Sequence, residues 1–107
     1  MAVTIEEIRK WLDPEEVDYP QAAAQLGPEA LPHLEELVRS SDSMLASKAV
    51  YLASLIRGES AVRILEHAIS RPEGAVRVAA AAGLKHLNED EAGRLVERLL
   101  TDQDVGV

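Results

Sequence analysis

The chain has 107 residues and a formal net charge of −8, and 47% of its residues are hydrophobic but only 3% are aromatic. This length suits one domain whose core consists of Leu, Ile, Val and Ala, since no Phe is present. The absence of cysteine excludes disulfides, thiolate metal sites and thiol nucleophiles. The acidic charge argues against a nucleic-acid partner, because binding to phosphates requires clustered Lys and Arg.

No membrane or export signal is predicted. The N-terminal residues lack a basic region followed by an apolar stretch, so they do not resemble a signal peptide. No apolar run approaches the roughly 18 residues that a membrane-spanning helix needs. We therefore expect a cytoplasmic protein without a membrane partner.

Hydrophobic periodicity and turn residues predict seven helices and no strand. In chain order the predicted helices cover about 4–12, 14–26, 28–39, 44–57, 59–71, 76–87 and 88–100. Asp13 and Pro14 are expected to begin the second helix, and Gly27 to end it in a left-handed conformation. Asn88 and Glu91 predict a capping box at the start of the last helix.

A block of about 31 residues occurs twice in succession, and the same residue types return at corresponding positions. Arg63 is followed by Arg94, for example, and Glu66 by Glu97. Periods of this length are typical of helical repeats that stack into a solenoid with a continuous core and an extended binding face. We therefore predict an all-α fold, an α-solenoid forming one domain over 1–107. Its parts would be a capping helix at 4–12, helix pairs at about 14–41, 42–72 and 73–103, and the start of a further unit at 104–107.

The repeat register also predicts which side chains are buried. In the second helix of each pair the expected core residues are Leu34, Val38, Val62, Leu65, Ile69, Val96, Leu99 and Leu100. Past the last pair, parts of Leu84, Leu95 and Leu99 are expected to face water. Exposed apolar surface of this kind usually marks a contact. We expect either a longer solenoid or self-association through the C-terminal end, unless the tail folds back over this surface.

The second helix of each predicted pair also has a face that points away from the core. In right-handed helical solenoids such a face lines the concave side, where partners dock. The candidate protein-binding residues are Glu35, Glu36, Arg39, Arg63, Glu66, His67, Arg94, Glu97 and Arg98. A solvated face with ordinary ion pairs is the alternative interpretation. Four basic groups, Arg63, His67, Arg94 and Arg98, are expected in a row along this face of an otherwise acidic chain. We therefore predict binding of another protein or an acidic peptide segment.

No pattern predicts catalysis, a metal or a cofactor. The three histidines, His33, His67 and His86, do not have the spacing of metal ligands or of a catalytic group. The acidic clusters 13–18 and 89–91 lie at helix starts, where the helix dipole and capping favour acids. Trp11 is interpreted as sealing the first helix pair, with an interface anchor as the alternative.

The segment Val76-Arg77-Val78-Ala79-Ala80-Ala81-Ala82-Gly83-Leu84 resembles the signature of bacterial HEAT-like repeats, the type also found in phycobilisome lyases. Residues 25–34 resemble the part between the two helices of a unit, and residues 102–107 the start of a further one. The resemblance covers about 18–107 and implies three HEAT-like helix pairs, with Arg77 linking neighbouring units through the Asp of the turn between them. Leu45-Ala46 departs from the Val-Arg of the family.

These observations predict a non-enzymatic scaffold or adaptor for protein–protein interaction that uses no cofactor. One alternative is a subunit or fragment of a larger HEAT-repeat protein, such as a chromophore lyase-like or regulatory enzyme. A second alternative is a helical repeat that binds nucleic acid, which the net charge disfavours.

Overall fold

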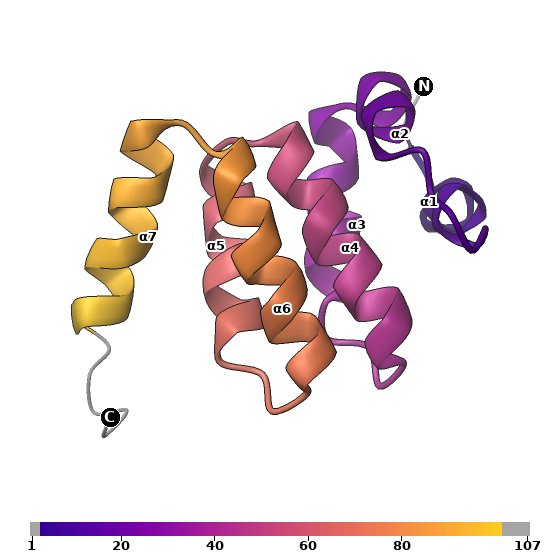
Figure 1. The fold of residues 1–107 in the computed structure, drawn as a ribbon. Coiled ribbons are helices and arrows are strands. Elements are labelled where there is room, and N and C mark those ends of the chain that lie inside the picture. The colour runs from indigo at the N-terminus through magenta and orange to yellow at the C-terminus, as the bar shows by residue number, and fades with distance from the viewer. Residues whose placement is uncertain (1–2, 102–107) are drawn as a thin grey trace.

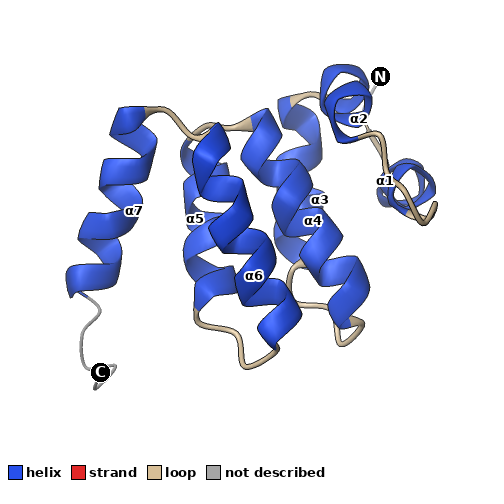
Figure 2. Ribbon diagram, viewed as in Figure 1, coloured by secondary structure: helices blue, strands red, loops and turns tan. Residues whose placement is uncertain are grey.

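The computed structural model describes residues 3–101, with the side chains of residues 3–97. These residues form seven α-helices and no strand (Figure 2). The helices are α1 (Ile5–Leu12), α2 (Tyr19–Leu26), α3 (Leu31–Leu37), α4 (Ser43–Ile56), α5 (Glu59–Ile69), α6 (Gly74–Gly83) and α7 (Glu89–Thr101). Short 3₁₀ helices, η1 (Pro28–Ala30) and η2 (Leu84–His86), precede α3 and follow α6. The predicted all-α fold class is confirmed for this part of the chain.

The helices lie in two rows that alternate along the chain (Figure 1). The first row is formed by α2, α4 and α6, which contact one another in series, and the second by α3, α5 and α7. Between the rows, α4 contacts α3 and α5, and α5 contacts α6. The last helix, α7, packs mainly on α5, while α1 contacts α4 at the opposite end. The described molecule measures 40 × 28 × 21 Å.

The start of α2 differs from the prediction. The helix begins at Tyr19 rather than at Pro14, and its N-cap is Asp18, whose Oδ1 accepts a hydrogen bond from the Gln21 N–H at 3.1 Å. Pro20 explains the difference, because a helix begun at Pro14 would carry this proline in its interior, where the ring removes a hydrogen bond and clashes with the preceding turn. In the first turn of α2 the same proline is tolerated.

Residues 13–18 therefore form a loop, and a lysine from α4 holds it in place. The Lys48 ammonium donates to the carbonyls of Leu12, at 2.8 Å, and Pro14, at 3.0 Å. These bonds satisfy a carbonyl that the end of α1 leaves without a helical partner. They also tie the N-terminal helix to the first row.

Six of the eight predicted core residues have described side chains, and four of these six are confirmed as buried. Leu34, Val38, Val62 and Leu65 are buried, whereas Ile69 is only partly buried. The side chains of Leu99 and Leu100 lie outside the described residues.

The prediction for α7 is wrong at two adjacent positions. Val96, expected in the core, is 52% exposed, and Leu95, expected to face water, is fully buried. The register compares α7 with α5, but the two helices have different surroundings. Helices pack on both sides of α5 within its row, whereas α7 packs mainly on α5. Only the side of α7 that faces α5 is therefore buried.

A buried carboxylate joins the end of α4 to the start of α7. After α4, Arg57 has a φ of 72° and Gly58 a φ of 101°. Such a φ is unfavourable for Arg57, because this residue has a side chain. Glu91, only 5% exposed, accepts from Arg57 Nε at 3.2 Å and from the Gly58 N–H at 2.9 Å. Glu91 also accepts from the Asn88 N–H and donates its own N–H to Asn88 Oδ1. The predicted capping box is confirmed.

This carboxylate predicts a specific loss of stability in acid. Burial by itself raises the pKa of Glu91, but the N–H groups of Asn88 and Gly58 and the Arg57 guanidinium outweigh it and hold the pKa below its ordinary value. A depressed pKa stabilises the fold above the pKa of the unfolded chain, and this contribution is lost as the pH falls through the folded-state pKa. We expect Glu91→Gln to lower the free energy of unfolding by about 2 kcal/mol at pH 7. The variant should also lose less stability than the unmodified chain between pH 7 and about pH 3.5.

Urea denaturation followed by circular dichroism at several pH values measures both effects. Glu89→Gln is the matched control, because Glu89 is exposed at the start of the same helix. An identical pH dependence for Glu91→Gln and the unmodified chain would contradict the role of this carboxylate.

Aromatic side chains from α2, α4 and η2 contact one another in series along the first row. The rings of Tyr19 and Tyr51 meet edge to face with centroids 4.8 Å apart, and the Tyr51 hydroxyl shares a hydrogen bond of 2.8 Å with His86 Nε2. The pKa of Tyr19 is raised by burial and by the neighbouring Tyr51. His86 therefore has a structural contact that links η2 to α4.

Candidate protein-binding groove

A groove of about 310 Å³ lies between α3 and α5 and the turns that follow them. Its lining residues are Glu35, Val38, Arg39, Arg63, Glu66, His67 and Ser70. The structure thus brings together Glu35, Arg39, Arg63, Glu66 and His67 from the predicted binding face. Val38, predicted as core, also lines the groove while being almost entirely buried.

The other predicted binding residues do not line this groove. Arg94 of α7 forms an ion pair with Glu59 of α5, with Nε and Oε1 3.0 Å apart. Glu36 and Glu97 are exposed elsewhere on the surface, and the Arg98 side chain lies outside the described residues. The groove therefore contains only the α5 part of the predicted basic row, Arg63 and His67, together with Arg39 of the turn after α3.

The cationic charge of the groove comes from its two arginines. Both Arg39 and Arg63 are exposed, and Arg63 Nη2 donates to Ser60 Oγ at 3.1 Å. The pKa of His67 is lowered by burial, and then by Arg39 and Arg71, with Glu35 acting in the opposite direction. A lowered pKa favours the neutral form of His67 at pH 7. Glu35 and Glu66 balance the formal charge of the two arginines, so the groove offers both positive and negative groups to a ligand.

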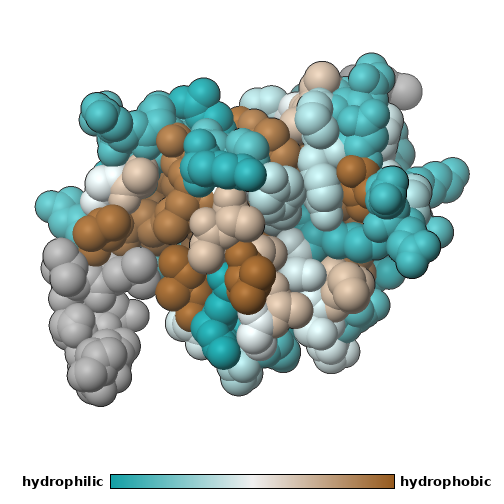
Figure 3. Space-filling model, in the orientation of Figure 1, coloured by the Kyte–Doolittle hydropathy of each residue, from teal (hydrophilic) through white to brown (hydrophobic). Residues whose placement is uncertain are grey.

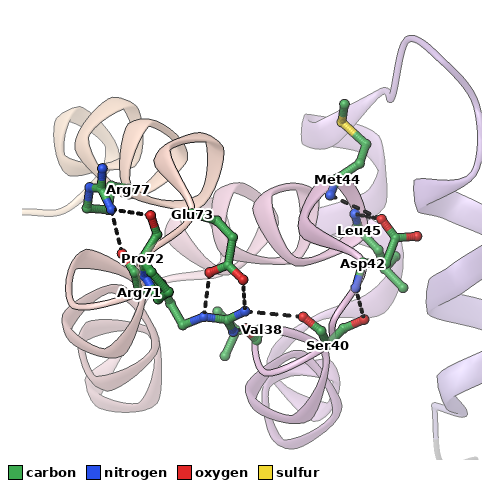
Figure 4. Close-up of polar contacts among 9 residues, drawn as sticks. All are labelled: Val38, Ser40, Asp42, Met44, Leu45, Arg71, Pro72, Glu73 and Arg77. Carbon is green, nitrogen blue, oxygen red and sulfur yellow. Dashed lines mark hydrogen bonds and ion pairs between the residues drawn. The ribbon is translucent and has the colours of Figure 1, made fainter.

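A partly buried guanidinium connects the two sides of the groove (Figure 4). Arg71, just after α5, donates to the carbonyl of Val38 and, at 3.3 Å, to that of Ser40, both in the turn after α3. Arg71 also forms a two-pronged pair with Glu73, in which Nε donates to Oε1 and Nη2, the nitrogen that contacts Ser40, donates to Oε2, both at 3.0 Å. Hydrogen bonds from Arg71 lower the pKa of Glu73. A planar guanidinium suits this task because it donates in several fixed directions at once.

Sequence reasoning missed Arg71 because the repeat does not conserve it. The positions one period before and after it are Ser40 and Asp102. A contact between turns of neighbouring units leaves no periodic signal when only one unit contains it. The arginine could be recognised only after the two turns were placed next to each other.

Arg77, expected to link neighbouring units through an Asp, has a more local role. Its Nη1 donates to the carbonyls of Arg71 and Pro72, both at 2.7 Å, within the turn that leads into its own helix (Figure 4). Asp42, the acid of the preceding inter-unit turn, instead caps α4 by accepting from the N–H groups of Met44 and Leu45. Arg71, rather than Arg77, reaches from the turn after α5 to the turn after α3.

Apolar surface gathers around α6 and α7 (Figure 3). Val78 is 68% exposed and Val96 is 52% exposed, whereas Leu84 is partly buried. This surface differs in its residues from the one predicted from the sequence, because Leu95 is buried.

Among the described residues, no group of three or more His, Cys, Asp or Glu side chains is arranged to hold a metal ion. No helix in the described range 3–101 is both long enough and apolar enough to cross a membrane.

No protein-family model, curated protein or solved structure matches this chain. The resemblance to HEAT-like repeats therefore stays a prediction from the sequence. The evidence for function comes from the geometry described above.

Proposed function

We propose that this protein is a non-enzymatic scaffold or adaptor of the helical-repeat type, which binds an acidic segment of another protein in the groove between α3 and α5. The observation that carries the proposal is the meeting of Arg39 and Arg63 in one groove of a chain with a net charge of −8. Two arginines in a groove with no net formal charge favour a defined binding position for an acidic segment, because the rest of the acidic surface repels the same ligand.

The repeat interpretation is part of the same proposal. The two rows of alternating helices support stacked helix pairs, and the period of about 31 residues supports the equivalence of those pairs. The groove would then lie on the face formed by the second helices of the first two pairs. Arg71 would keep this face rigid by joining the turn after α3 to the turn after α5.

Charge reversal in the groove tests the proposal. The probe is a fluorescently labelled peptide of alternating glutamate and glycine, and binding is measured by anisotropy at low salt. We expect Arg63→Glu to weaken binding by about tenfold, since it removes one opposite charge and adds a repulsive one. We also expect the affinity of the unmodified chain to rise from pH 7 to about pH 5.5, because bound carboxylates favour the protonated form of His67.

Lys85→Glu is the matched control, because it makes the same change in charge at an exposed position outside the groove. Equal losses from the two substitutions would show that only the total charge matters and would contradict the assigned site. Absence of binding at millimolar peptide would contradict the proposed function itself.

A second candidate is self-association through the apolar surface of α6 and α7. In α4, Val50 is fully buried, whereas Ala81, one period later in α6, is exposed. Because α6 packs on α4, the equivalent face of α6 is suited to another helix of the same kind. A second copy of the chain provides such a helix, and a two-fold contact would cover both faces at once.

Light scattering over a range of protein concentrations tests this candidate. We expect the unmodified chain to dimerise as its concentration rises and Val78→Asp to remain monomeric, since burying the new carboxylate is unfavourable. Met44→Asp is the control, because Met44 is 61% exposed on α4 and lies apart from this surface. A chain that stays monomeric at every concentration would refute self-association.

A further inference from the structure

A second surface pocket, separate from the groove between α3 and α5, lies beside the N-terminal helix. It has a volume of about 330 Å³ and is lined by Glu7, Lys10, Trp11, Pro14, Glu16 and Asp18. The first three belong to α1, and the others to the loop between α1 and α2 and to the N-cap of α2. The pocket thus exists only because residues 13–18 form a loop rather than the helix expected from the sequence.

The walls combine an aromatic ring with carboxylates. Trp11 is partly buried and packs against the core, so α1 holds its ring in a fixed position. Two of the carboxylates are also fixed, because Glu7 Oε1 accepts from the Thr4 N–H at 3.0 Å and Asp18 Oδ1 caps α2. Glu16 is exposed at the rim. Three carboxylates and one ammonium make the pocket locally negative.

This combination selects for an organic cation with an apolar stem. A cation is attracted to the face of an indole ring and to carboxylates, while apolar walls accommodate methylene groups. The carboxylates do not form a metal site, because the described residues contain no group of acids arranged to hold an ion. An acidic or neutral ligand would lack the charge attraction.

We propose that this pocket binds an arginine side chain from a basic segment of a partner protein. Arginine fits better than lysine because its planar guanidinium can stack on the Trp11 ring while its N–H groups pair with a carboxylate such as Glu16. The partner segment is opposite in charge to the one proposed for the groove. The two proposed sites therefore bind different ligands, and an experiment can contradict one proposal without contradicting the other.

The only tryptophan of the chain provides a direct measurement. The full chain is titrated with a Gly-Arg-Gly-Arg-Gly peptide and with the same peptide containing citrulline, which has nearly the shape of arginine but no charge. The single indole N–H resonance in NMR spectra reports on the pocket, and tryptophan fluorescence gives a second reading. We expect a saturable shift with the arginine peptide and about tenfold weaker binding of the citrulline peptide.

Substitutions at two neighbouring glutamates distinguish binding in this pocket from general attraction of the peptide to an acidic protein. Glu16→Gln should weaken arginine-peptide binding by about threefold, as expected for an exposed ion pair. Glu15→Gln makes the same change in charge at an exposed residue outside the pocket and should have no effect. Equal losses from the two substitutions, equal binding of the two peptides, or an unchanged indole resonance at millimolar arginine peptide would each overturn the proposal.

Discussion

Leu65→Ala is expected to lower the free energy of unfolding by about 3 kcal/mol. Leu65 is fully buried in α5, the helix that contacts both neighbours of its row as well as α4 and α6. Removing its branched end would leave a cavity that four surrounding helices cannot easily fill, because each is held by contacts of its own. Urea denaturation followed by circular dichroism measures the loss.

Val96→Ala is the matched comparison, one period later in α7. The repeat register predicts equal losses at the two positions, but Val96 is 52% exposed. The structure therefore predicts a loss of less than about 1 kcal/mol for Val96→Ala, as is usual for surface substitutions. Losses of similar size for Leu65→Ala and Val96→Ala would show that another element covers α7.

Gly83→Ala is expected to lower the free energy of unfolding by about 2 kcal/mol, because it would overpack the contact between α6 and α4. A Cβ atom at Gly83 would lie 2.7 Å from Ser54 Cβ and 2.8 Å from Ser54 Oγ. Ser54 cannot easily move aside, since it is fully buried and its hydroxyl donates to the Tyr51 carbonyl at 2.6 Å. The helices would have to separate or shift to admit one methyl group.

Gly93→Ala is the control, and its expected change in the free energy of unfolding is opposite in sign. Gly93 lies inside α7, and a Cβ there meets no atom within 4 Å. Alanine should therefore stabilise the helix by about 0.5–1 kcal/mol, because it restricts the unfolded chain more than glycine does. Thermal unfolding of both variants measures the difference. If Gly83→Ala also stabilised the protein, α4 and α6 could not be as close as the structure places them.

The helices could be predicted because their signals are local. The capping box of Asn88 and Glu91 and the positive φ of Gly27 depend on residues adjacent in the chain, and both agree with the sequence-based expectation. The buried positions Leu34 and Leu65 follow from helical periodicity, which is also local. The incorrect start of α2 had a local signal as well, since Pro20 does not fit inside a longer helix.

The groove could be predicted in part, because one face of a helix is readable from the sequence but its neighbours are not. Arg63, Glu66 and His67 were expected on one face of α5, and they line the groove. Which charges lie opposite them depends on the packing of α3, which brings in Glu35 and Arg39. Packing also pairs Arg94 with Glu59 and lowers the pKa of His67.

The sequence by itself determined the all-α class, the number of helices and most of the buried stripe, because each depends on spacing within one helix or one turn. Only the tertiary structure decided the contacts between units. It placed Arg71 against the turn after α3, Gly83 against Ser54, and Trp11 beside the loop at 13–18. These contacts join residues far apart in the chain and occur in one unit only, so no periodic pattern records them. The position of a helix at the end of its row likewise decided that Leu95 is buried and Val96 is exposed.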